Sequence, residues 1–104
     1  MPFVRLSLMT PKPGQTQRAS ELLDRLIDFY QRRPGFVAAY RLTPDGTGAP
    51  GRIGRVSIWE HKEDANHTAA EQTDISLQSE LKLISEEETH EEHSFEGVGG
   101  VAKR

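Results

Sequence analysis

The spacing between apolar residues changes along the chain, and these changes limit the folds that it can adopt. Residues 3–9 alternate, with Val4, Leu6 and Leu8 opposed to their neighbours, which is the two-residue period of a strand. Over residues 15–33 the apolar residues recur at three- and four-residue steps, which predicts an amphipathic helix. Pro and Gly directly after this segment predict where the helix ends.

Strand signals return after this helix. Residues 36–42 and 53–60 are rich in β-branched and aromatic side chains, and the Pro- and Gly-rich residues 44–51 between them predict the flexible loop of a hairpin. Helical spacing begins again at Lys62, and residues 91–98 permit a last strand. The second half of the chain therefore repeats the order of strand, helix and strand.

The whole order is strand, helix, strand, strand, helix, strand, which is a split βαβ unit of the α+β class. We expect one four-stranded antiparallel sheet with helices on one face, in a single domain over residues 1–98 followed by a tail over 99–104. The second helical region should form two pieces, with Thr73 or Asp74 capping the second.

The predicted sheet has apolar side chains on both faces. In the first strand Phe3 and Met9 oppose Val4, Leu6 and Leu8, and in the third strand Ile53 and Trp59 oppose Val56 and Ile58. An uncovered apolar sheet face is typical of an association surface. We therefore expect a homodimer that pairs sheet faces about a two-fold axis and buries Phe3, Ile53 and their neighbours. The alternative is that these residues lie near strand ends under the tail.

Composition removes several function classes. A net charge of −3 and a pI near 5.8 give no basic surface for nucleic acid or anionic lipid. The absence of cysteine excludes disulfides, thiolate nucleophiles and cysteine-ligated metal centres. We expect a cytoplasmic protein without a membrane segment, because no apolar run resembles a signal peptide or reaches spanning length.

Several short motifs occur in an order typical of a known family. They are Lys-Pro-Gly at 12–14, Arg-Pro-Gly-Phe-Val at 33–37, Val-Ser-Ile-Trp-Glu at 56–60 and Glu-Asp-Ala at 63–65. In this order the chain resembles the antibiotic-biosynthesis-monooxygenase-like domain of the dimeric α+β barrel superfamily. The resemblance implies a ferredoxin-like subunit that pairs its sheet with a second subunit's and holds a cavity between sheet and helices.

The resemblance also implies a choice of chemistry. Some members oxidise aromatic polyketides with dioxygen and neither metal nor flavin, others degrade haem, and many have no known activity. The haem-degrading members use a strand asparagine, a histidine and a helix tryptophan. Here Arg5 or Ser7 occupies the strand position, and Trp59 lies on a strand. We therefore expect no cofactor.

Three aromatic or titratable residues are candidate catalytic residues. Trp59 could wall a pocket for a flat aromatic ligand, or it could be a core or interface aromatic. Tyr40 could donate a hydrogen bond to a substrate oxygen, as could Tyr30, whose helix position favours the core. His67 could act as an acid or base under the second helical region, or it could be exposed.

Arg5, Ser7, Arg55 and Ser57 are candidate substrate-binding residues. If the first and third strands are neighbours, these side chains share one sheet face and bring two guanidinium groups together. Buried like charges need a negative partner, which could be an anionic ligand or a carboxylate such as Glu96. The alternative is an exposed location in which solvent screens the two charges.

The remaining histidines do not predict a metal site. His61 is expected in solvent, and the separation of His90 and His93 does not match the ligand spacing of a zinc helix or the same face of a strand.

Three functions remain open: a cofactor-independent monooxygenase acting on a small aromatic or polyketide-like compound, a non-catalytic ligand-binding or stress-related dimer, and an RNA-binding module. The third lacks the spaced aromatic residues that stack bases.

Overall fold

The computed structural model of the chain describes residues 1–46 and 51–101, and it has the order of elements that the sequence predicts. The elements are β1 (Phe3–Met9), α1 (Thr16–Tyr30), β2 (Phe36–Leu42), β3 (Ile53–Trp59), α2 (Lys62–Ala69), α3 (Gln72–Leu83) and β4 (Glu91–Glu96). Within the described residues the strands form one four-stranded antiparallel sheet in the order β2-β3-β1-β4. The α+β prediction is confirmed.

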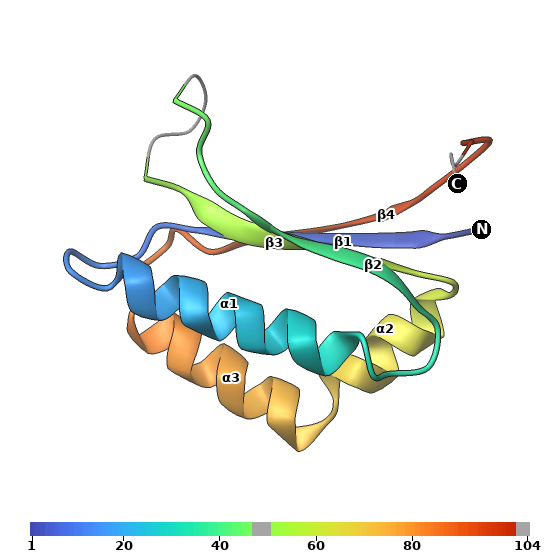
Figure 1. Cartoon of the computed structure of the whole chain (residues 1–104), viewed down its shortest axis with the longest axis horizontal. Helices are drawn as coiled ribbons and strands as arrows, with labels where there is room; N and C mark the ends of the chain where they lie inside the picture. Colours follow the sequence, from blue (N-terminus) through green and yellow to red (C-terminus); the bar gives the residue numbers. More distant parts are fainter. Residues whose placement is uncertain (47–50, 102–104) are drawn as a thin grey trace.

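All the helices lie on one side of the sheet (Figure 1). The predicted pairing of β2 with β3 is present, with a register shift between Phe36 and Ala38 at the start of β2. Part of the predicted flexible loop of this hairpin, residues 47–50, lies outside the described residues. On the other side of β1, strand β4 returns beside the N-terminus, and the Gly97 N–H donates to the Pro2 carbonyl at 2.8 Å (Figure 1).

Helix α1 ends at Tyr30, three residues before the predicted end at residue 33. The chain turns there, and Gly35 adopts a φ of +78°, a left-handed conformation that glycine adopts at low cost. A Cβ at this position would also lie 2.0 Å from Oδ2 of Asp64 at the start of α2. Gly35 therefore lets the exit of α1 pack against α2.

The core lies between the helices and one face of the sheet. Its largest contributors include Leu22, Leu23 and Leu26 of α1 and Leu81 of α3. Phe3 and Ile53 face these residues and are each only 4% exposed, so the prediction that they form the dimer surface is wrong. Alternation correctly divided each strand into two apolar sets, but because both sets are apolar it did not indicate which set the helices cover.

The opposite sheet face carries the other apolar set, and none of the described helices covers it (Figure 1). Val4, Leu6, Leu8, Val56 and Ile58 are partly exposed there. Their cross-strand neighbours Tyr40 and Phe95 are 61% and 53% exposed. We refer to this surface as the open face.

The second helical region forms the two predicted pieces, but neither predicted residue caps α3. The N-cap residue is Glu71, which makes no side-chain capping bond, and Thr73 and Asp74 lie inside the first turn. Strand β4 ends at Glu96, before the predicted end at residue 98. Of the tail, residues 102–104 lie outside the described residues. No described helix has the length and apolar character needed to cross a membrane.

Candidate functional site

Polar side chains interrupt the apolar core on the helix-covered face of the sheet. Arg5 pairs with Ser57 and Ser7 pairs with Arg55 in the antiparallel register of β1 and β3, so these four side chains share one face, as the sequence predicts. Ser7, Arg55 and Ser57 are each at most 3% exposed. The helices therefore cover these residues, and they do not lie at an exposed edge.

A small cavity of about 20 Å³ lies among these residues, and we call it the inner cavity. Its lining comprises Arg5, Tyr30, Arg55, Ser57, Trp59, Ala65, Ala69, Asp74, Gln78 and Glu92. This volume holds about one water-sized group. The cavity therefore accepts a single polar atom and excludes an aromatic ring.

A wider recess adjoins the inner cavity, and we call it the outer cleft. It measures about 310 Å³ and lies between α3 and the β1–β4 side of the sheet. Both spaces share Arg5, Ala69, Asp74, Gln78 and Glu92, and the outer cleft adds Ile75, Ser79, Lys82 and His90. The two spaces therefore adjoin along a common wall.

Arg55 is the most unusual residue of the inner cavity. Its Nε donates to the Tyr30 hydroxyl at 3.1 Å, and its guanidinium carbon lies 5.8 Å from the centre of the Tyr30 ring. No carboxylate among the described residues forms an ion pair with it within 4.0 Å, and its buried Nη1 has no hydrogen-bond partner there. An unpaired buried donor costs about 1–3 kcal/mol, so an acceptor that reached this N–H would be favoured.

Asp74 supplies a carboxylate to the same cavity from the first turn of α3, where it is 3% exposed. Burial raises the pKa of Asp74 above its ordinary value, while the charge of Arg55 and hydrogen-bonding from Gln78 and Tyr30 act in the opposite direction. A carboxylate with a raised pKa accepts a proton more readily than an exposed one. Asp74 is therefore suited to act as a base.

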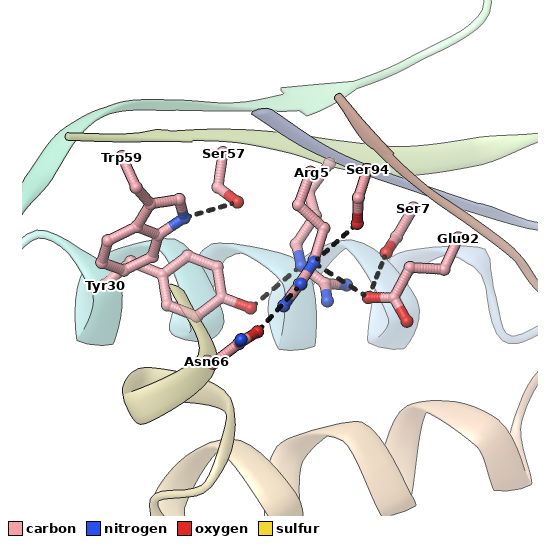
Figure 2. A network of polar contacts seen from close by, with 9 residues as sticks. Arg5, Ser7, Tyr30, Ser57, Trp59, Asn66, Glu92 and Ser94 are labelled. Carbon is pink, nitrogen blue, oxygen red and sulfur yellow. Dashed lines mark hydrogen bonds and ion pairs between the residues drawn. The ribbon is translucent and has the colours of Figure 1, made fainter. Parts of the chain in front are cut away.

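Arg5 closes one side of the inner cavity through a polar network (Figure 2). Its Nε donates to Ser94 Oγ at 3.3 Å, and its Nη2 donates to Asn66 Oδ1 at 3.2 Å. Its Nε also lies 4.0 Å from Oε1 of Glu92, which accepts a hydrogen bond from Ser7 Oγ at 3.5 Å. The network ties β1 to β4 and α2.

The carboxylate beside the arginines is therefore not the predicted Glu96. Glu96 is exposed and pairs with Phe3, the first residue of β1, whereas Glu92 lies opposite Ser7. The sequence alone did not give the register of β4 against β1, and a shift of four residues moves a side chain by about 13 Å along a strand.

Trp59 belongs to both the core and the cavity wall. It is 2% exposed, its Nε1 donates to Ser57 Oγ at 3.0 Å, and its ring packs edge-on against Tyr30 at 5.5 Å. Burial raises the pKa of Tyr30 to about 12, so its hydroxyl stays protonated at neutral pH. The packed rings of Tyr30 and Trp59 therefore form the aromatic part of the inner cavity wall.

The other two candidate catalytic residues lie elsewhere. Tyr40 pairs with Val56 and is on the open face, on the far side of the sheet from the cavity. His67 is exposed on α2, because Ala65 and Thr68 are the residues that this helix turns toward the sheet. Neither side chain lines the inner cavity or the outer cleft. In the described part of the chain no group of three or more His, Asp or Glu residues could hold a metal ion.

Four lining or network residues were missed by the sequence reasoning: Asp74, Gln78, Asn66 and Glu92. Polar residues on a helix usually form its solvated face, and α3 is only weakly amphipathic. One signal was available, because Asp74 and Gln78 are four residues apart and so share one side of the helix.

Comparisons with known proteins bear on the fold. No protein-family model matches the chain, and no curated protein is similar to it in sequence. Among solved structures it is similar to SnoaB, a cofactor-independent oxygenase from Streptomyces nogalater, with a TM-score of 0.82 and 16% identity over 98% of each chain.

Two further structures have the same arrangement. A candidate antibiotic biosynthesis monooxygenase from Nitrosomonas europaea has a TM-score of 0.83 and 14% identity, over 97% of this chain and 94% of that one. Rv0793 from Mycobacterium tuberculosis has a TM-score of 0.83 and 11% identity, over 98% and 100%. At these identities the likeness shows the fold, and the expected resemblance to antibiotic-biosynthesis-monooxygenase-like domains is confirmed at that level.

Proposed function

We propose that this chain, which has the fold of antibiotic-biosynthesis-monooxygenase-like domains, is a cofactor-independent oxygenase of a small aromatic compound that can form an enol or phenol. One observation carries the proposal. A buried arginine with an unused N–H, Arg55, and a buried carboxylate with a raised pKa, Asp74, line the same cavity beside Trp59. Paired groups of this kind stabilise a developing oxyanion and accept a proton.

The reaction follows from these two groups. The Asp74 carboxylate removes a proton from a CH₂ carbon that is conjugated through the aromatic rings with the substrate carbonyl, as in anthrone, and the electron pair moves onto the carbonyl oxygen as an enolate facing Arg55. The enolate transfers one electron to dioxygen, and the resulting radical and superoxide combine through a new carbon–oxygen bond.

The remaining steps convert the peroxide into the product. The peroxide takes the proton back from Asp74. The hydroperoxide then loses water as the O–O bond and the remaining C–H bond break. A CH₂ group and O₂ thus become C=O and H₂O, so one oxygen atom enters the product. No electron donor other than the substrate is needed.

Oxygen uptake tests the proposal. Protein treated with chelator and freed of flavin is mixed with anthrone, whose enol is a phenol, and dioxygen consumption and quinone formation are followed. We expect both to depend on the protein and to fall at least about a hundredfold in the Asp74→Asn variant, as for loss of a general base. A requirement for metal or flavin would refute the proposal, and ligand binding without uptake would favour the non-catalytic alternative.

We also propose that the chain is a homodimer paired through the open face. In support, Leu6, Val56 and Ile58 lie at the centre of a sheet surface that no described helix covers, and Tyr40 is 61% exposed beside them. An isologous pairing would bury this apolar surface on both subunits at once. The cavity lies on the other face of the sheet, so it would stay open to ligand in such a dimer.

A further inference from the structure

We infer that the site binds its aromatic ligand through one negatively charged oxygen, a phenolate, which accepts a hydrogen bond from Nη1 of Arg55. This inference rests on the proposed function and names the charge state and class of its substrate.

The unused donor points to an acceptor from outside the chain. Arg55 is 3% exposed, and the only hydrogen bond of its Nε goes to Tyr30. The Nη1 atom is fully buried and has no hydrogen-bond partner among the described residues, and Arg55 is one of the residues that line the inner cavity. Hydrogen bonds from guanidinium to an anionic oxygen are shorter and stronger than those to a neutral one. A bound phenolate oxygen would therefore satisfy this donor better than a phenol would.

The charges around the inner cavity favour an anion. Arg5 of β1 has its own carboxylate, Glu92 of β4, at 4.0 Å, and Tyr30 of α1 stays neutral. Burial raises the pKa of Asp74 of α3, which favours the neutral form that Asp74 has once it has taken the proton of the substrate, and α2 contributes only Ala65 and Ala69 to the lining. In that state the charge of Arg55 on β3 is the one without a matched partner among the described residues.

The charged groups of the outer cleft do not change this balance. Lys82 of α3 adds a positive charge to its lining, and burial lowers the pKa of His90, which favours the neutral imidazole. A ligand that approaches through the outer cleft therefore meets a positive Lys82 before it reaches Arg55. Both groups favour the ionised form of a phenol.

The sizes of the inner cavity and the outer cleft determine how the ligand is oriented. The inner cavity, at about 20 Å³, admits one oxygen-sized group, and the outer cleft, at about 310 Å³, is large enough for a ring. The ligand oxygen therefore enters the inner cavity, and its ring stays in the outer cleft near Ile75 and Ala69.

The test uses 4-nitrophenol, which ionises near neutral pH and is yellow only as the phenolate. Binding is followed by quenching of Trp59, the only tryptophan of the chain, and ionisation by the yellow absorbance across a pH series. We expect the phenolate to bind at least about tenfold more tightly than the phenol, which lowers the apparent pKa of the bound ligand by about one unit or more. The methyl ether 4-nitroanisole, which cannot ionise, should bind at least about tenfold more weakly.

Variants assign the effect to Arg55. Arg55→Gln should abolish the shift in ligand pKa, and Arg55→Lys, which keeps the charge, should restore part of it. Arg41→Gln is the matched control, because Arg41 lies opposite Arg55 in the β2–β3 register but pairs with Asp24 on α1 at 2.9 Å, away from both spaces. This control should bind 4-nitrophenol as the unaltered chain does.

The possible results separate the two proposals. Equal binding of 4-nitrophenol and 4-nitroanisole, or a shift in ligand pKa that survives in Arg55→Gln, would overturn the inference. If Arg55→Gln does not fold, the comparison of the two ligands on the unaltered chain still decides. Phenolate binding without oxygen uptake from anthrone would support the inference and refute the oxygenase, whereas uptake without any preference for the phenolate would do the reverse.

Discussion

Replacing Arg55 by methionine should stabilise the fold while it removes the function. The guanidinium is 3% exposed, has no ion-pair partner within 4.0 Å among the described residues and leaves Nη1 unpaired. Relief of one unsatisfied buried donor is worth about 1–3 kcal/mol, and exchange of buried charges for an apolar side chain of similar volume is often neutral or stabilising. A methionine side chain adapts to such irregular space.

The opposing loss is the hydrogen bond from Nε to the Tyr30 hydroxyl at 3.1 Å. This loss costs about 1 kcal/mol, because the hydroxyl remains near Asp74 and can donate there. Asp74 loses the favourable charge of Arg55 and becomes neutral more readily, so no bare carboxylate is left buried. The net expectation is a gain of about 1–2 kcal/mol in the free energy of unfolding, and each kcal/mol raises Tm by about 4–8 °C in a domain of this size.

Urea unfolding at a fixed protein concentration, followed by Trp59 fluorescence and far-ultraviolet circular dichroism, measures this gain. Arg41→Met is the control, since its ion pair with Asp24 is largely exposed and worth at most about 1 kcal/mol. A loss of more than about 1 kcal/mol in Arg55→Met would refute the reasoning, because it would mean that the guanidinium is fully paired in solution and serves the fold.

Three further predictions concern other parts of the molecule. Asp74→Asn should stabilise the fold at neutral pH. The folded state of the unaltered chain holds the Asp74 proton more tightly than the unfolded state, so the unaltered chain loses stability as the pH rises through the raised pKa. In urea titrations, the difference in free energy of unfolding between the variant and the unaltered chain should therefore vanish below about pH 3.8. Leu6→Glu should convert a dimer into a monomer in sedimentation at micromolar concentration, and an unchanged sedimentation coefficient would exclude the open face as the interface. Tyr30→Phe should remove the phase near pH 12 from a spectrophotometric titration, and persistence of that phase would assign it to another group.

Much of the fold followed from the spacing of apolar residues. The two-residue period of β1 and the helical period of α1 survive in the structure because burial on one face of each element dictates them. The prediction failed where local sequence carries no information. Phe3 and Val4 are both apolar, so only the packing of the helices decided that Phe3 is covered and Val4 is partly exposed.

The residue pattern of the strands also predicted part of the site. Arg5, Ser7, Arg55 and Ser57 came together because strand parity and the β1–β3 neighbourhood suffice to place them. To place Asp74 in the site, one must know how α3 is rotated about its axis, and the mixed polar and apolar residues of this helix do not define that rotation. To place Glu92 in the site, one must know the register of β4, which depends on its long-range pairing with β1.

A crystal structure of the protein with 4-nitrophenol would show where the ligand oxygen binds. We expect the ring in the outer cleft and the phenolate oxygen about 2.7–2.9 Å from Nη1 of Arg55, with Trp59 in van der Waals contact beside it. A ligand bound on the open face, or an Arg55 whose Nη1 is already bonded to Asp74 with the ligand elsewhere, would contradict it.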